Sequence, residues 1–137
     1  MKTHSTNYFN TFIEIAEDCS AASGEVPPEK GGQKTVSNLH YDIVLKNPYK
    51  YTSDDVFFQV FAERYELVLE EYKEAREKFF SKGQPCFRAS PLTKRYGWGV
   101  HSNANGKVAL YSCASEAYQR LSKDPAIKTL KAMKSKR

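Results

Sequence analysis

The chain has 137 residues, of which 40% are hydrophobic, 27% are charged and 13% are aromatic. This composition fits one folded domain with a single core and excludes disordered, fibrous and disulfide-scaffold proteins. Apolar runs are too short to span a membrane, and the opening residues lack the apolar region of a secretory signal. We therefore expect one cytoplasmic domain over residues 1–137, with frayed ends at 1–7 and 134–137.

Charge is distributed unevenly along the chain. Residues 1–78 hold nine Lys or Arg against fourteen Asp or Glu, whereas residues 79–137 hold twelve against two. Such a basic half attracts an anionic ligand, a nucleic acid or an acidic protein, unless it pairs with the acidic half in the fold. Cys19, Cys86 and Cys113 show neither a CxxC motif nor zinc-ligand spacing with histidine, so we expect reduced thiols and no metal.

The first half of the chain predicts one strand, one loop and three helices. Alternating apolar residues predict the strand over 8–15, and repeated Gly and Pro predict the loop over 17–34. The helices are expected at 35–46, from 52 to about 65, and at 66–81. Thr35 and Thr52 are the expected N-caps of the first two helices. Asp54 and Asp55 are expected in the first turn of the second helix, where the helix dipole favours them, and not as metal ligands. The buried face of the second helix is expected to comprise Val56, Val60 and the row Phe57, Phe61 and Tyr65.

The last third of the chain changes to the two-residue period of strands. Strands are expected at 86–90, 95–102 and 107–113, followed by a short helix that Ser115 caps. Residues 124–137 fit either a helix or a strand that returns to the sheet. Together these elements predict a single α+β domain, with an antiparallel sheet of three to five strands and helices packed on one face.

The expected hairpins determine which side chains share a face of the sheet. A four-residue turn after Ser90 pairs 86–90 with 95–99, and a three-residue turn with Gly106 in the left-handed conformation brings Tyr111 opposite Gly99. The tryptophan face, expected against the helices, comprises Phe87, Tyr96, Trp98, Val100, Val108 and Leu110. The glycine face comprises Cys86, Arg88, Arg95, Gly97, Gly99, His101, Tyr111 and Cys113.

The glycine face is the candidate ligand site. Its expected contributions are charge from Arg88 and Arg95, hydrogen bonds from His101 and Tyr111, and clearance at Gly97 and Gly99. Arginine offers a planar fork that fits carboxylate or phosphate, and residues 79–115 contain no acid that would compete for it. Two glycines in one strand indicate the close approach of a bulky group, which is a ligand, another helix or the loop 17–34.

Three functions remain open from these residues. The first is a binding module that takes an anionic small molecule or an acidic segment on the glycine face. The second is an enzyme with Cys86 as nucleophile and His101 nearby, although no carboxylate is placed to orient the imidazole. The third is a nucleic-acid-associated protein, although the sequence contains no recognised nucleic-acid-binding motif. None of the three requires a cofactor.

Several segments of the sequence resemble a known family. The run Gly83–His101, together with Asn47–Asp55, Asn10–Ile13 and Ala132–Arg137, resembles the domain of unknown function 6157. The resemblance covers nearly the whole chain, and its central run is long enough to be specific. It implies one domain, and it brings no activity, substrate or catalytic residue to this sequence.

Overall fold

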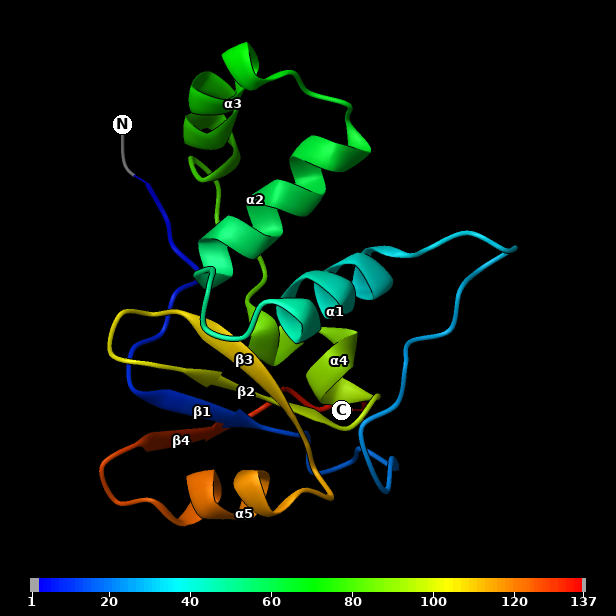
Figure 1. The fold of residues 1–137 in the computed structure, drawn as a ribbon, viewed down its shortest axis with the longest axis vertical. Helices are drawn as coiled ribbons and strands as arrows, with labels where there is room; N and C mark the ends of the chain where they lie inside the picture. The colour runs from blue at the N-terminus through cyan, green and yellow to red at the C-terminus, as the bar shows by residue number, and fades with distance from the viewer. Residues whose placement is uncertain (1–2, 137) are drawn as a thin grey trace.

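The computed structural model describes residues 3–136, and a four-stranded sheet lies at its centre (Figure 1). The strands are β1 (Thr11–Glu14), β2 (Trp98–Ser102), β3 (Val108–Ser112) and β4 (Lys128–Lys131). They lie in the order β3-β2-β1-β4, and only the pair β1 and β4 is parallel. The α+β fold with a mostly antiparallel sheet is thus confirmed, and residues 128–131 return to the sheet as a strand.

Helices lie on both sides of this sheet, and not on one face as predicted. They are α1 (Val36–Lys46), α2 (Ser53–Arg64), α3 (Tyr72–Phe79), α4 (Pro91–Lys94) and α5 (Glu116–Lys123). In Figure 1, α1 to α4 lie above the sheet, and α5 lies below it. None of the helices within residues 3–136 is both long enough and apolar enough to cross a bilayer.

The tryptophan face packs against helices as predicted. Its members Phe87, Val100, Val108 and Leu110 belong to one buried cluster with Tyr41, Val44 and Leu92, and Tyr96 and Trp98 pack against that cluster. The register of β2 and β3 is also the predicted one, because Tyr111 pairs with Gly99 and Gly106 has a φ of 78°. Hydrophobic burial and one left-handed glycine are therefore sufficient to set this hairpin.

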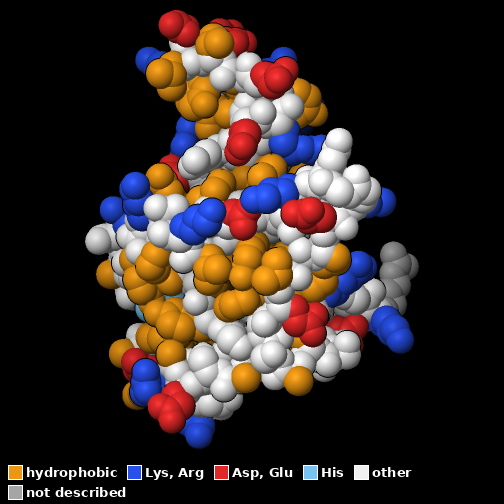
Figure 2. Space-filling view, turned by 45° about the vertical axis from the view of Figure 1, so that its right-hand side comes forward, with side chains coloured by type: hydrophobic (Ala, Val, Ile, Leu, Met, Phe, Trp, Pro, Cys, Tyr) orange, Lys and Arg blue, Asp and Glu red, His pale blue; other side chains and the backbone are white. Residues whose placement is uncertain are grey.

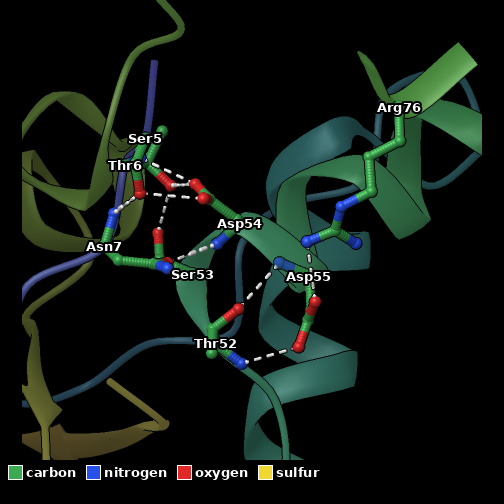
Figure 3. A network of polar contacts seen from close by, with 8 residues as sticks. All are labelled: Ser5, Thr6, Asn7, Thr52, Ser53, Asp54, Asp55 and Arg76. Atoms are coloured by element: carbon green, nitrogen blue, oxygen red, sulfur yellow. Dashed lines mark hydrogen bonds and ion pairs between the residues drawn. The ribbon is translucent and has the colours of Figure 1, made fainter. Parts of the chain in front are cut away.

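Thr35 and Thr52 begin α1 and α2 as predicted. Each side chain accepts a hydrogen bond from the backbone N–H three residues later, and the side chain of that residue, Asn38 or Asp55, accepts one from the N–H of the cap. These reciprocal pairs are capping boxes, which satisfy two of the free donors at a helix start. Asp55 also pairs with Arg76 at 2.9 Å (Figure 3).

Residues 5–7 run alongside the start of α2 (Figure 3). The Asp54 carboxylate accepts hydrogen bonds from the backbone N–H and the hydroxyl of Thr6, both at 2.7 Å, and from the Ser5 hydroxyl at 2.8 Å. The Asn7 side chain accepts one from the backbone N–H of Asp54 at 2.9 Å. These contacts join residues 5–7 to α2, the expected fraying of residues 1–7 stays a prediction, and residues 1 and 2 lie outside the described part of the chain.

The C-terminal residues are held in a similar way. The backbone N–H groups of Ser135 and Lys136 donate to the Asp18 carboxylate at 3.0 Å and 2.9 Å. These bonds lower the pKa of Asp18, the largest effect coming from Lys136. Residues 135 and 136 are thus joined to Asp18, the expected fraying of residues 134–137 stays a prediction, and residue 137 lies outside the described residues.

Residues 86–90 do not form the predicted strand. They contain a 3-10 turn, Phe87–Ala89, which leads directly into α4. Ser90 caps that helix by accepting a hydrogen bond from the Leu92 N–H at 3.2 Å, and Pro91 fits the first helical position, where its fixed φ suits the helix and no N–H is needed. The first expected hairpin is therefore absent.

Two other elements differ from the prediction because a residue adopts a left-handed backbone conformation. Glu66 has a φ of 51°, which ends the helical path after α2, so the expected helix 66–81 is replaced by a 3-10 turn, Leu69–Glu71, and α3. Asn10 has a φ of 48°, and β1 starts only after it instead of at residue 8. Residues 17–34 form a loop as expected, with one isolated bridge between Lys30 and Gln33.

Candidate functional site

The glycine face of the sheet is covered by the protein itself. A Cβ atom at Gly99 would lie 2.5 Å from Cζ of Phe12 and 2.7 Å from Cε2 of Tyr118, which belongs to α5. At Gly97, with a φ of 77°, a Cβ atom would lie 2.4 Å from the carbonyl oxygen of Ser23 in the loop 17–34. The two glycines thus allow the close approach of α5 and of the loop 17–34. These two segments occupy the space that was expected for a ligand.

The structure divides the four predicted polar binding residues among three places. Arg95 is exposed and follows the last turn of α4. Arg88 donates from Nε to a backbone carbonyl of β4 at 2.9 Å. His101 and Tyr111 remain together on the glycine face. Because residues 86–90 are not a strand, the expected cluster of four does not form, and ligand binding by any one of them stays a prediction.

Tyr49 joins His101 to Tyr111, a contact that the sequence did not predict. Its hydroxyl lies 2.8 Å from Nδ1 of His101 and 2.6 Å from the hydroxyl of Tyr111. Burial and the hydrogen bond with Tyr111 raise the pKa of Tyr49, while burial lowers the pKa of His101, so both groups are neutral near pH 7. One of these bonds uses the Tyr49 hydroxyl as donor and the other uses it as acceptor, so both roles of this hydroxyl are filled inside the cluster.

Cys86, the predicted nucleophile, lies next to Tyr8 rather than His101. Its Sγ atom is 3.5 Å from the Tyr8 hydroxyl. Burial and this hydrogen bond raise the pKa of Tyr8, and the neighbouring Arg88 guanidinium opposes the rise. The half-buried thiol also lies on the wall of a hollow between α1, α2 and residues 84–91.

This hollow has a volume of about 360 Å³ and lies between α1, α2 and residues 84–91. Protein sites for small molecules start at about 300 Å³ and are mostly apolar, with a few polar groups. Four aromatic rings line the hollow: Phe57, Phe61, Tyr65 and Phe79. The polar side chains of the wall are Ser37, His40, Arg64, Gln84, Cys86 and Ser90. Volume and lining therefore both match a small-molecule site.

One row of α2 side chains builds much of the hollow. Phe57, Phe61 and Tyr65 follow one another at four-residue spacing and so share one helix face. The sequence predicts this row as buried, but Phe57 and Phe61 are only partly buried and Tyr65 is 66% exposed. Val56 and Val60 already fill the core beside them. The sequence signal for the hollow was thus an additional apolar row on a helix that already buries Val56, Phe58, Val60 and Ala62.

Apolar exposure continues from Tyr65 into the connection between α2 and α3. Val68 and Leu69 are 55% and 79% exposed. Figure 2 shows hydrophobic side chains at this end of the molecule, with acidic side chains beside them. The hollow therefore opens beside an apolar and acidic surface.

His40 forms the buried part of the wall. The residue is 8% exposed, and its ring packs edge-on against Phe57, with ring centroids 4.7 Å apart. Burial lowers the pKa of His40 to about 4, so the imidazole is neutral at pH 7. Within residues 3–136 no hydrogen bond joins its ring to another residue, and its nitrogens are not among the fully buried atoms. Sequence reasoning did not single out His40, because nothing local marks it.

Arg64 forms the exposed part of the wall. It follows Phe57 by seven residues on α2, which is roughly 10 Å along the helix axis. It forms no ion pair with any other residue in the range 3–136. Of the described residues that line the hollow, Arg64 alone carries a charge at pH 7. The hollow thus offers a neutral hydrogen-bonding group inside and a cation at its rim.

Two other hollows have charges of both signs on their walls. One, of about 430 Å³, includes Lys73 and the pair Asp55 and Arg76, whose charged atoms lie 2.9 Å apart. The other, of about 280 Å³, lies beside Tyr111 and includes Arg120 and Asp124, which are of opposite sign. The part of the chain that the structure describes contains no group of His, Cys, Asp and Glu that could hold a metal ion. The hollow beside α1 and α2 is therefore the candidate site.

Comparison with known proteins identifies one family. Its model, described as "Family of unknown function (DUF6157)", matches residues 3–137. No curated protein and no solved structure matches the sequence. The match covers essentially the whole length, including the segments that showed the resemblance. The chain therefore belongs to the DUF6157 family.

Proposed function

We propose that the protein is a small-molecule-binding domain, and that the hollow between α1, α2 and residues 84–91 takes an aromatic molecule with one anionic group. One observation carries this proposal: the hollow is lined by four aromatic rings and has Arg64 as the only charge of its described wall. Apolar contact supplies the affinity, and the guanidinium recognises a carboxylate. The anionic ligand expected from the sequence is thus retained, at a different place in the fold.

Two probes that differ only in charge test this proposal. They are 2-naphthoate and 2-naphthamide, which carry the same rings with an anionic or a neutral group. By calorimetry we expect one 2-naphthoate to bind per chain, and more tightly than 2-naphthamide. Arg64→Gln should weaken 2-naphthoate roughly two- to fivefold, because an exposed ion pair contributes little, and leave 2-naphthamide unchanged. Arg120→Gln, which removes a charge outside the hollow, is the control.

A substitution that fills the hollow tests the location. Ser37 is partly buried and lines the hollow from α1, so Ser37→Phe places a ring in the space that the probe needs. We expect this variant to lose binding of both probes, whereas Ser20→Phe, at an exposed position of the loop, should retain it. Unchanged binding to Ser37→Phe would show that the probes bind elsewhere and would refute the proposal.

A second proposal, a cysteine-dependent enzyme, is supported by the position of Cys86 on the wall of the same hollow. It predicts that iodoacetamide at pH 7 alkylates Cys86 faster than Cys19 or Cys113, and that 2-naphthoate protects it. Burial raises the pKa of Cys113, which slows its alkylation. Peptide mass spectrometry measures the three rates, and an inert Cys86 would remove the enzyme proposal.

Location and nucleic-acid binding have tests of their own. We propose a cytoplasmic location, because Cys19, Cys86 and Cys113 are all free thiols, as is usual in a reducing compartment. Imaging of a tagged protein measures this location, and a secreted or organellar signal would contradict it.

The nucleic-acid alternative predicts retention on a DNA column that weakens steeply with salt, and no retention at low salt would dispose of it.

A further inference from the structure

His40 is a buried polar side chain whose hydrogen-bonding capacity is unused within residues 3–136. It lines the hollow, is 8% exposed, and has no hydrogen-bond partner there. A neutral imidazole has one N–H donor and one nitrogen acceptor. Its ring nitrogens are not among the fully buried atoms, so a ligand that excludes water from the hollow would leave them unsatisfied unless it brings a hydrogen-bonding group of its own.

The positions of His40 and Arg64 set the shape of that partner. The His40 ring contacts Phe57. Arg64 follows Phe57 by seven residues on α2, which is a rise of roughly 10 Å along the helix axis from Phe57 to Arg64. Both residues line the same hollow, the first on its buried wall and the second at its exposed rim. A molecule that meets both needs a hydrogen-bonding group and an anionic group at opposite ends of an apolar body.

We propose that the ligands of this hollow are hydroxylated aromatic carboxylates, with the hydroxyl bonded to His40 and the carboxylate facing Arg64. This inference rests on the proposed function, because it concerns the same hollow. A hydroxyl both donates and accepts, so it suits the neutral imidazole in either tautomer. A carboxylate against His40 would be buried without a positive charge, which is unfavourable, so the charged end lies at the rim. Burial lowers the pKa of His40 to about 4 and thus keeps the ring neutral.

A pair of probes that differ by one hydroxyl tests the role of His40. In 6-hydroxy-2-naphthoate, the hydroxyl and the carboxylate lie at opposite ends of the ring system of 2-naphthoate. By calorimetry we expect the hydroxylated probe to bind roughly five- to tenfold more tightly to the wild-type protein. His40→Phe keeps an aromatic ring and removes both nitrogens, so the two affinities should become equal at the level of 2-naphthoate. His101→Phe, in the Tyr49 cluster, is the control and should keep the preference.

Nitrogen NMR of the wild-type imidazoles gives a readout that does not depend on folding of a variant. The hydroxylated probe should shift the ring nitrogen resonances of His40 much further than 2-naphthoate does, because only the hydroxylated probe forms a hydrogen bond with the ring. If both probes bind equally and the His40 nitrogens do not respond, the inference is overturned while the proposed function stands. If neither probe binds, the proposed function fails and this inference fails with it.

Discussion

The substitution Gly99→Ala tests whether the glycine face is closed by the chain itself. The added methyl group would lie 2.5 Å from Cζ of Phe12 and 2.7 Å from Cε2 of Tyr118. Carbon atoms in contact lie about 3.5–4.0 Å apart, so both distances are about 1 Å too short. Phe12 is fully buried, Tyr118 is 7% exposed, and their rings pack edge-on at 4.9 Å. Neither ring can therefore move without disturbing the core.

The expected cost follows from this overpacking. Extra atoms in a packed core cost about 1–3 kcal/mol, and two buried rings place Gly99→Ala near about 2–3 kcal/mol. Alanine also reduces the conformational entropy of the unfolded chain, which stabilises the variant by only about 0.4–1 kcal/mol. The free energy of unfolding falls by about 1–3 kcal/mol per molar urea, so the urea concentration at the midpoint of unfolding should fall by about 1 M.

Urea unfolding followed by circular dichroism measures this effect. Gly83→Ala is the matched control, because no atom lies within 4 Å of the position of its Cβ, and we expect no loss of stability. A second variant that shortens Tyr118 should recover part of the loss in combination with Gly99→Ala, since the two positions are in contact. Wild-type stability of Gly99→Ala would refute the closed face and return Gly97 and Gly99 to the list of ligand-binding candidates.

Three further predictions concern stability. Thr52→Ala removes the capping box of α2 and should lower the free energy of unfolding by about 1 kcal/mol in urea, and no change would contradict the role of the cap. Asp54→Ala removes the carboxylate that holds Ser5 and Thr6, so limited proteolysis should cleave there faster than in the wild type, and equal rates would show that other contacts hold the segment. The unfolded chain protonates His40 near pH 6.5 but the folded protein only near pH 4, so stability is lost as pH falls through this window. Between pH 7 and pH 4.5 the free energy of unfolding of the wild type should fall by about 2–3 kcal/mol more than that of His40→Phe, and equal losses would contradict the lowered pKa.

Elements set by local chemistry could be predicted from the sequence. Thr35, Thr52 and Ser115 cap their helices through bonds to residues three positions away, so the signal lies within one turn. The β2–β3 hairpin is set by alternation of burial and by Gly106, which are both visible in a short window. These features required no knowledge of how distant parts of the chain pack.

Residues 86–90 show where local signals conflict. Their alternation fits a strand, while Ser90 and Pro91 fit the start of a helix, and the helix forms. The expected anion site depended on that strand, because only a hairpin would have placed Arg88 beside Gly97. One incorrect element was thus enough to remove a site composed from four side chains.

The hollow and the Tyr49 cluster depend on packing between distant segments. His40 and Arg64 belong to different helices, and the separation of α1 from α2 decides whether their apolar rows meet or leave a space. Tyr49 and His101 lie 52 positions apart in the chain, yet their side chains are 2.8 Å apart. Periodicity shows that a residue faces inward, but it does not show which distant side chain it meets.

Amide chemical-shift mapping with 2-naphthoate tests the central claim most directly, because it locates the bound probe without any substitution. The account predicts saturable shifts confined to the segments that line the hollow, which are residues 36–40, 57–65 and 84–91 together with Phe79. Shifts centred on Tyr111 and Arg120, or a spectrum that does not change at saturating probe, would contradict it.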